Sequence, residues 1–241
     1  MPKDNLLLAS LSSDNRESLM SRCTAVELPL KTLLYAAQEI PRYAYFMTSG
    51  LASVVVATAS GQAAEVGFIG SEGIVGGMHL LGPASLPTDC MIQLEASALR
   101  IPLIELKAAF HSSDEIRERI LEMAQEQALS MSQISACNRL HEAEERLARW
   151  LLMAQDRTQV DVLLFTQEFL AEMLGSQRTT VTVIAGALQR SGLIEYSRGH
   201  VRILNREELE SAACDCYQVC RNLQVNLYGK ALRPTQIDTT V

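Results

Sequence analysis

The stretch FTQEFLAEMLGSQRTTV, which covers residues 165–181, decides the fold of the second half of this chain. Its apolar residues stand at the i, i+3 and i+4 spacing of one helix face, at Leu170, Met173 and Leu174. Gly175 then favours a turn, while Thr166 and Ser176 are residue types that cap helix N-termini. The sequence therefore predicts two short helices that meet across a glycine turn, the helix-turn-helix arrangement.

The second of these helices, from Ser176 to Arg190, is expected to expose its N-terminal end. Its apolar face is formed by Val181, Ile184, Ala185 and Leu188, and its outward face by Thr179, Thr182, Val183, Gly186 and Arg190. In a helix-turn-helix the N-terminal residues of the second helix face base edges in the major groove. We therefore expect DNA contacts from both caps, from the start of this helix and from the hairpin that follows it: Thr166, Ser176, Gln177, Arg178, Thr179, Thr180, Thr182 and Arg198.

A small hairpin is expected directly after these helices. Residues 194–196 and 201–203 alternate in polarity around Ser197-Arg198-Gly199-His200, so that arginine and histidine lie at the tip of a wing. Residues 176–203 carry four arginines against one glutamate, whereas the whole chain has a net charge of −7. This balance argues against a protein that coats nucleic acid and favours one focused contact.

A long helix is predicted before this region. Ser112 and Glu115 have capping-box spacing, and residues 114–137 contain no glycine or proline. Alternating steps of four and three residues, the spacing of a coiled-coil seam, connect Ile116, Ile120, Met123, Gln127, Ser130, Ile134 and Cys137. We predict that this helix pairs with a second copy through Ile116, Ile120, Met123, Gln127 and Ile134. The alternative is that the helix packs along its own domain.

The first half of the chain is expected to be mostly β. From about residue 26 to residue 106, short apolar runs alternate with glycine and proline, and residues 54–56, 65–69 and 91–94 are predicted strands. Gly67, Gly70, Gly73 and Gly76 recur every third residue, which we interpret as tight turns between strands. No glycine-rich loop ends in Lys-Ser/Thr, so a nucleotide P-loop is not expected. A further helix is predicted over residues 142–155, with Leu147, Trp150, Leu151 and Ala154 on one face.

The size and composition are those of a folded protein in the cytoplasm. The chain has 241 residues, 48% hydrophobic and 20% charged, which fits two compact domains and excludes bulk disorder. It has no apolar run of membrane-spanning length and no signal-peptide pattern at its start, so no membrane association is expected. Its six cysteines are too sparse for a disulfide scaffold and are expected to be reduced thiols.

Nearly the whole chain resembles the Crp/Fnr family of bacterial transcription regulators. Residues 165–181 and 188–194 look like the helix-turn-helix of this family, EERLARWLL at 144–152 like the helix that leads into it, and the β half like a cyclic-nucleotide-binding β-roll. The resemblance implies an α+β fold with a β-roll sensor domain (1–111), a dimerisation helix and hinge (112–140) and a winged helix-turn-helix domain with a C-terminal helix (141–241). It also implies double-stranded DNA, a second copy of the chain and RNA polymerase as partners.

The sequence departs from this family at both of its functional regions. Arg178 matches the first arginine of the recognition helix, but Thr179 replaces the usual glutamate and Val183 the later arginine. Because threonine and valine offer different groups to a base pair, the best-known half-site is not expected. In the effector region Ile74 replaces the glutamate that binds ribose, no arginine stands at the phosphate position, and Asp89 adds a charge that would repel a phosphate. The sequence thus predicts a signal other than cyclic AMP.

Other cofactors are not expected. An iron-sulfur regulator of this family needs an N-terminal cysteine cluster, and here only Cys23 lies there, while His79 is a weak candidate for a haem ligand. The three C-terminal cysteines, Cys214, Cys216 and Cys220, lack a neighbouring histidine or a second CxxC, so we interpret them as buried thiols and predict no metal site. The alternative is soft-metal or redox sensing, because Cys216 and Cys220 are spaced i, i+4 on one helix face.

The predicted function is a transcription regulator and not an enzyme. The four histidines fall in separate elements of the sequence, at positions 79, 111, 141 and 200, and no catalytic triad or carboxylate pair is evident. Two alternatives stay open, an enzyme that processes a small molecule and a protein-interaction module that keeps the fold without binding DNA.

Overall fold

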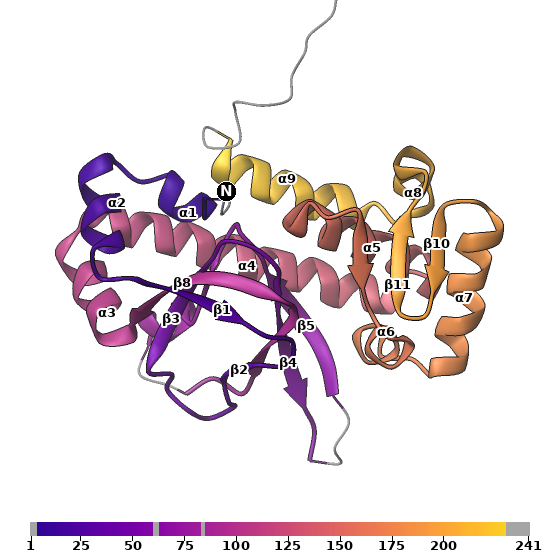
Figure 1. Ribbon diagram of the computed structural model, residues 1–241, viewed down its shortest axis with the longest axis horizontal. Coiled ribbons are helices and arrows are strands. Elements are labelled where there is room, and N and C mark those ends of the chain that lie inside the picture. The colour runs from indigo at the N-terminus through magenta and orange to yellow at the C-terminus, as the bar shows by residue number, and fades with distance from the viewer. Residues whose placement is uncertain (1–3, 60–62, 83–84, 230–241) are drawn as a thin grey trace, which may run out of the picture.

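The computed structural model describes residues 4–59, 63–82 and 85–229 of the chain. A long helix, α4 (Asp114–Leu140), runs along the middle of the molecule, with a β-roll against one part of it and a smaller helical domain against its end (Figure 1). The predicted fold class, a β-roll followed by a long helix and a winged helix-turn-helix, is confirmed.

The β-roll consists of two antiparallel four-stranded sheets within the described residues. One sheet has the order β1 (Thr24–Leu28), β8 (Ala96–Pro102), β3 (Tyr43–Met47) and β6 (Ile74–Val75). The other has the order β2 (Leu33–Tyr35), β7 (Asp89–Leu94), β4 (Leu51–Ala57) and β5 (Ala63–Ile69). A 3-10 turn, η1 (Gly77–Leu80), follows β6. Apolar side chains of both sheets form a common core, as period-two strands with one buried face require.

One of the four regularly spaced glycines is not a turn. Gly67 lies inside β5, and a Cβ at this position would come 3.2 Å from Cε of Met131 on α4. The missing side chain therefore allows α4 to approach the strand closely. Gly76 does form a turn, with φ of 89°, a conformation that residues with a side chain rarely adopt.

Three helices of the first half were not predicted. They are α1 (Leu6–Ala9), α2 (Ser13–Met20) and α3 (Leu103–Ser112), which lie together at one end of α4 (Figure 1). The buried Asn5 side chain fixes the start of α1, because its Nδ2 donates to the carbonyl oxygens of Met47 and Gly73 at 2.9 and 2.8 Å. The predicted capping position is also one residue early, since Ser113 rather than Ser112 accepts from the backbone N–H of Ile116.

The apolar stripe of α4 is covered by its own chain. Ile116, Ile120 and Met123 belong to the core formed with α1, α3 and the β-roll, and each is at most 2% exposed. Ile134 is 9% exposed and Gln127 half-buried, and both line a cavity against β5. The prediction that these five residues form a dimer seam is therefore wrong. The alternative holds for this face, because a stripe already covered by its own domain has no surface left for a partner.

The opposite face of α4 is exposed. It presents Leu121, Leu129 and Leu140 to solvent, and Leu140 is 75% exposed. Ala128 and Ala136 lie between these leucines and are also exposed. These leucines and alanines share the exposed face with polar residues such as Gln125, Ser132 and Arg139.

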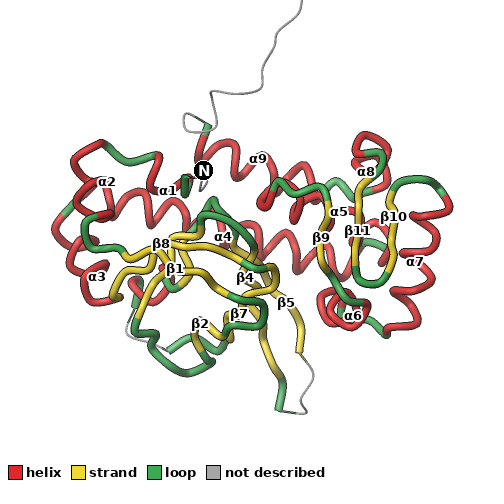
Figure 2. Tube along the Cα trace, viewed as in Figure 1, coloured by secondary structure: helices red, strands yellow, loops and turns green. Residues whose placement is uncertain are grey.

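The C-terminal domain packs around Trp150. Its helices are α5 (Ala143–Thr158), α6 (Gln167–Leu174), α7 (Arg178–Arg190) and α8 (Arg206–Ala212), and α9 (Cys216–Tyr228) returns along α4. The predicted hairpin, β10 (Ile194–Ser197) and β11 (His200–Ile203), gains a third strand, β9 (Val162–Leu164), beside β11 (Figure 2). Apolar residues of α5, α6 and α7 meet in one core, as their helical spacing predicted.

Candidate DNA-binding surface and effector region

The N-terminal end of α7 is open to solvent. Gln177, Arg178, Thr179 and Thr182 are exposed, and Thr180 and Ser176 are half-buried. Val181, Ala185 and Leu188 anchor the opposite face of the helix in the core of the domain. The backbone N–H of Thr180 donates to the carbonyl oxygen of Gln177 at 2.9 Å. The positive end of the helix dipole faces outward, where it favours a negatively charged group.

The two predicted caps differ in the structure. Thr166 caps α6, because its Oγ1 accepts from the backbone N–H of Phe169 at 3.2 Å. Ser176 does not cap α7: the N-cap residue is Gln177, and the Ser176 hydroxyl is buried without a partner among the described residues. Gly175, with φ of 59°, makes the turn between the two helices as predicted.

Arg178 contacts the first helix of the pair. Its Nε donates to Oε1 of Gln167 at 3.3 Å, and Nη1 lies 3.8 Å from a carboxylate oxygen of Glu168. Because both charged side chains are more than half exposed, this pair contributes little to stability and can open. The guanidinium therefore lies near the outer surface of the two helices. It can leave Glu168 and bind another anion.

The outer face of α7 carries the residues that replace the family's usual pair. Val183 is 66% exposed although it is apolar, and Thr179 lies one turn before it on the same exposed face. Thr182 donates its hydroxyl to the carbonyl oxygen of Arg178 at 3.1 Å, which still leaves its lone pairs available. This surface can offer hydroxyl and methyl contacts, together with one arginine, to a base-pair edge.

The wing brings a second basic group to the same domain. Arg198 and Gly199 have φ of 50° and 82°, so the tip is the tight two-residue turn that suits a twisted hairpin. Arg198, His200 and Arg202 are all exposed. The structure thus places both predicted elements, α7 and the wing, at the surface of one domain (Figure 1).

The two residues singled out in the effector region, Ile74 and Asp89, both have partners within the protein. Ile74 is 1% exposed and belongs to the core, so its side chain replaces a binding group with apolar packing. Asp89 is occupied within the protein, because its Oδ1 accepts from the backbone N–H of Ala37 at 2.7 Å. An anionic ligand gains no charge-assisted bond from either residue.

The cavity enclosed between the β-roll and α4 is small. Its volume is about 30 Å³, and it is lined by β4, β5, α4 and α5. Small-molecule sites have volumes of roughly 300–1,000 Å³, so this cavity holds little more than a water molecule. A second cavity of about 450 Å³ is open to solvent beside α3, where Arg42, Lys107 and His79 are among its lining residues.

Buried carboxylates surround the smaller cavity. Glu72 pairs with Arg157 of α5 at 2.7 Å, and the guanidinium also lies over the Phe68 ring at 4.7 Å. Glu126 of α4 accepts from the Ser130 hydroxyl at 2.8 Å, and burial raises its pKa above the usual value. The pair of Glu72 and Arg157 thus connects the β-roll to α5 through a buried polar contact beside the cavity.

His79 is a packed side chain of η1. Its ring meets the ring of Tyr35 edge to face at a centroid distance of 4.9 Å, and the residue is buried. Burial lowers the pKa of His79, because desolvation disfavours the imidazolium. The structure thus places His79 against Tyr35 in the protein interior.

The prediction that the C-terminal cysteines have no histidine beside them is wrong. The sequence offered no histidine beside Cys214 and Cys216, yet the structure brings His141 and Cys137 to them, from the end of α4. The signal in the sequence was the Cys-x3-His spacing of residues 137 and 141, which places both on one face of a helix turn. Cys220, the third cysteine of the predicted trio, lies outside this group.

Two family models match the chain. A cyclic nucleotide-binding domain matches residues 25–113, and a Crp-like helix-turn-helix domain matches residues 145–212. The comparison with curated proteins gave no match. Among the described residues, no helix has both the length and the apolar character needed to cross a membrane.

Several solved structures share this fold over their whole length. A putative transcriptional regulator of the Crp/Fnr family from Eubacterium rectale has 16% identity and a TM-score of 0.66, covering 86% of this chain and 96% of its own. FixK2 from Bradyrhizobium japonicum has 16% identity and a TM-score of 0.69, covering 80% and 98%. The c-di-GMP-responsive global regulator CLP of Xanthomonas campestris has 17% identity and a TM-score of 0.65, covering 80% and 100%.

Proposed function

Because this chain belongs to the Crp/Fnr family of transcription regulators, we propose that it binds a specific double-stranded DNA sequence as a homodimer, in response to a signal other than cyclic AMP. The observation that carries this proposal is the exposed N-terminal end of α7, with Arg178 held at its surface beside α6. In a helix with a purely structural role, we would expect the N–H groups of this end to be buried or to be paired with a capping side chain.

Sequence recognition is assigned to α7 and the wing. Arg178 is the one side chain of the first turn that can bind guanine O6 and N7 through two hydrogen bonds, and Val183 can contact a thymine methyl group. Arg198 at the wing tip is suited to a phosphate or to the minor groove beside the site. The remaining predicted contacts, including Gln177 and Thr179, can add single hydrogen bonds.

Dimerisation is assigned to the exposed face of α4, in place of the stripe expected from the sequence. Leu121, Leu129 and Leu140 lie along this face and lose their contact with water when two copies pair. Pairing along α4 would hold two copies of α7 at a fixed separation. A dimer that reads two half-sites needs a separation of about 34 Å along the duplex.

A signal other than cyclic AMP is supported by the effector region. Ile74 and Asp89 supply neither ribose nor phosphate contacts, and the cavity beside α4 has a volume of about 30 Å³. Membership of the family also supports RNA polymerase as a partner and the cytoplasm as the site of action. No feature of the described residues favours an enzyme over a regulator.

The test is selection of bound fragments from genomic DNA with the purified full-length protein, followed by titration of the selected site at several salt concentrations. We expect an inverted repeat whose half-sites lie one helical turn apart, and affinity that falls as salt rises. A protein that enriches no sequence and binds all fragments equally weakly would instead be an interaction module. Calorimetry with cyclic AMP and cyclic GMP tests the effector, and micromolar binding of either would contradict this part of the proposal.

A further inference from the structure

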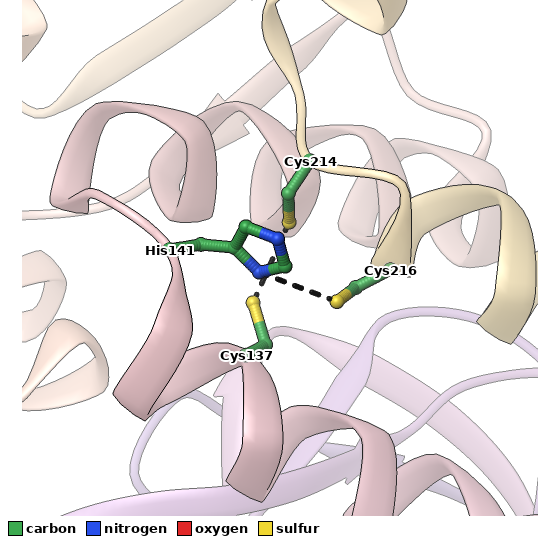
Figure 3. Close-up of side chains that lie close together, drawn as sticks. All are labelled: Cys137, His141, Cys214 and Cys216. Carbon is green, nitrogen blue, oxygen red and sulfur yellow. Dashed lines mark hydrogen bonds between the residues drawn. The ribbon is translucent and has the colours of Figure 1, made fainter.

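Four ligand-type side chains meet where the helix-turn-helix domain joins the rest of the chain. They are Cys137, His141, Cys214 and Cys216, and their ligand atoms all lie within 4.8 Å of one another (Figure 3). Sγ of Cys137 is 3.4 Å from Sγ of Cys214, and Sγ of Cys216 is 3.5 Å from Nδ1 of His141. Three thiols and one imidazole thus point toward one small volume.

We propose that these four residues bind a single zinc ion in a tetrahedral Cys3His site. With Zn–S bonds of about 2.3 Å and a Zn–N bond of about 2.0 Å, tetrahedral coordination sets the sulfur atoms about 3.8 Å apart and sulfur and nitrogen about 3.5 Å apart. The distance of 3.5 Å between Sγ of Cys216 and Nδ1 of His141 matches the second value, and the distance of 3.4 Å between the Cys137 and Cys214 sulfur atoms is shorter than the first, so these two thiols would move slightly apart around an ion. The three thiols release their protons to solvent when the ion binds, and the imidazole binds in its neutral form.

The surroundings of the four residues are those of a ligand shell. Nε2 of His141 lies 3.4 Å from the carboxylate of Asp215, which leaves Nδ1 for the metal. A metal-bound histidine commonly donates its second N–H to a carboxylate in this way. Gln133 donates from Nε2 to Sγ of Cys216 at 3.0 Å, a bond that stabilises a thiolate.

Burial separates this group from ordinary surface cysteines. The three cysteines form a small cluster of their own and are at most 5% exposed, whereas His141 is partly exposed and gives the ion a path of entry. Three thiolates and one zinc ion leave a net negative charge. The guanidinium of Arg149, which is buried and acts electrostatically on Cys137, offsets that charge.

A disulfide does not account for the arrangement. The Cys137 and Cys214 sulfur atoms are 3.4 Å apart, well beyond a bonded pair of about 2.05 Å, and a disulfide would leave Cys216 and His141 without a role. All six cysteines of the chain are free.

The position of the site suggests what the ion would do. Cys137 lies in the last turn of α4 and His141 directly after it, whereas Cys214 lies just before α9 and Cys216 is its first residue. The helix-turn-helix domain therefore leaves the long helix and returns to it at the same point. An ion there fixes both ends of that domain against the long helix. The consequence for DNA affinity rests on the proposed function, whereas metal binding itself does not depend on it.

The site is tested on the full-length protein purified under reducing conditions. We expect zinc at about one ion per chain, and, after removal with a chelator, cobalt(II) should restore the visible absorption of a tetrahedral thiolate site. Cys214→Ser, Cys216→Ser and His141→Ala should each abolish this spectrum. Cys220→Ser is the matched control, because Cys220 is equally buried on α9 but lies outside the group.

A second type of variant separates loss of zinc binding from loss of the fold. Asp215 is mostly exposed, so Asp215→Asn should leave the fold intact while it weakens zinc binding about 10–100-fold through the lost contact with His141. The proposal is overturned if the folded protein binds neither zinc nor cobalt, or if air oxidation yields a Cys137–Cys214 disulfide in a protein whose reduced form takes up no metal. It is also overturned if His141→Ala keeps full affinity, because a thiolate-only site would then be present.

The effect of zinc on DNA affinity is measured separately, by fluorescence anisotropy with the selected DNA site. The zinc-loaded protein should bind about 5–150-fold more tightly than the stripped protein, the usual range of coupling between two sites. Equal affinities would overturn the coupling, and absence of DNA binding in both forms would overturn the proposed function. The cobalt titration still decides the metal site in either case.

Discussion

Nε1 of Trp150 donates a hydrogen bond of 2.7 Å to Oε1 of Glu65, across 85 positions of the sequence. Trp150 belongs to α5 at the start of the matched helix-turn-helix domain, and Glu65 belongs to β5 of the β-roll. The other carboxylate oxygen accepts from the Ser53 hydroxyl at 2.6 Å. This buried contact helps to hold the two domains in one relative position, because the Trp150 N–H would lose its acceptor if the domains separated.

Trp150→Phe is therefore expected to destabilise the protein by about 1–3 kcal/mol, because it removes the buried hydrogen bond that the indole N–H donates to Oε1 of Glu65. Urea unfolding followed by circular dichroism measures the change. Glu65→Gln is the comparison, since its side-chain oxygen can still accept from Trp150 and it should cost less. Equal losses in the two variants would show that the hydrogen bond contributes little.

The buried pair of Glu72 and Arg157 gives a second prediction. Arg157→Met should cost about 3–5 kcal/mol, because the Glu72 carboxylate then stays buried without its cation. Adding Glu72→Gln removes that charge, keeps an acceptor for the backbone N–H of Gly70 and should recover most of the loss. The interpretation fails if the double variant is no more stable than the single one in chemical denaturation.

Glu126 predicts a pH dependence of stability. Burial is the largest cause that raises the pKa of this carboxyl in the folded protein, so the folded state binds its proton more tightly than the unfolded state does. The favourable contribution is present at low pH and is lost as pH rises through the raised pKa. Glu126→Gln should thus gain stability over the unmodified protein as pH rises from the ordinary pKa of a glutamate carboxyl through the raised one. Melting temperatures across this range would contradict the assignment if the difference did not grow with pH.

Arg178→Ala tests the recognition helix. We expect a loss of about 1–3 kcal/mol in binding to the selected site, together with relaxed preference at one base pair. The control is Arg22→Ala, an exposed arginine of the β-roll far from α7. If Arg178 contacted phosphate alone, affinity would fall equally for all sequences and the salt slope would decrease by about one.

The exposed strip of α4 is tested by charge. Leu121→Glu combined with Leu129→Glu should yield a folded monomer in sedimentation, because two carboxylates on each helix would repel across the interface. Ile104→Glu places the same charge on α3 at another exposed apolar position and should leave the dimer intact. If the double variant still sediments as a dimer, the dimer interface does not lie on this face of α4.

Periodic and capping signals in the sequence predicted much of the secondary structure. The helix-turn-helix followed from the apolar spacing around Leu170 and Leu188 and from Gly175, and the structure confirms both helices and the turn. The long helix followed from an uninterrupted run after residue 113. The short helices α1 and α2 were missed, because they are held by contacts such as those of Asn5 with distant backbone groups.

The two corrections have a common cause. Spacing in the sequence put Ile116, Ile120 and Met123 on one face of α4, but only the fold shows that the β-roll and its flanking helices cover that face. Likewise, the sequence contained every residue of the Cys3His group, yet Cys137 and Cys214 are 77 positions apart and meet only because α9 begins where α4 ends.

Local order was thus set by the sequence itself, since helix periodicity, caps and turns depend on residues within a few positions of each other. Which faces are covered, which carboxylates are buried and which thiols meet a histidine were decided by the tertiary structure. These features depend on packing between segments that are distant along the chain, and no spacing rule within one segment contains that information.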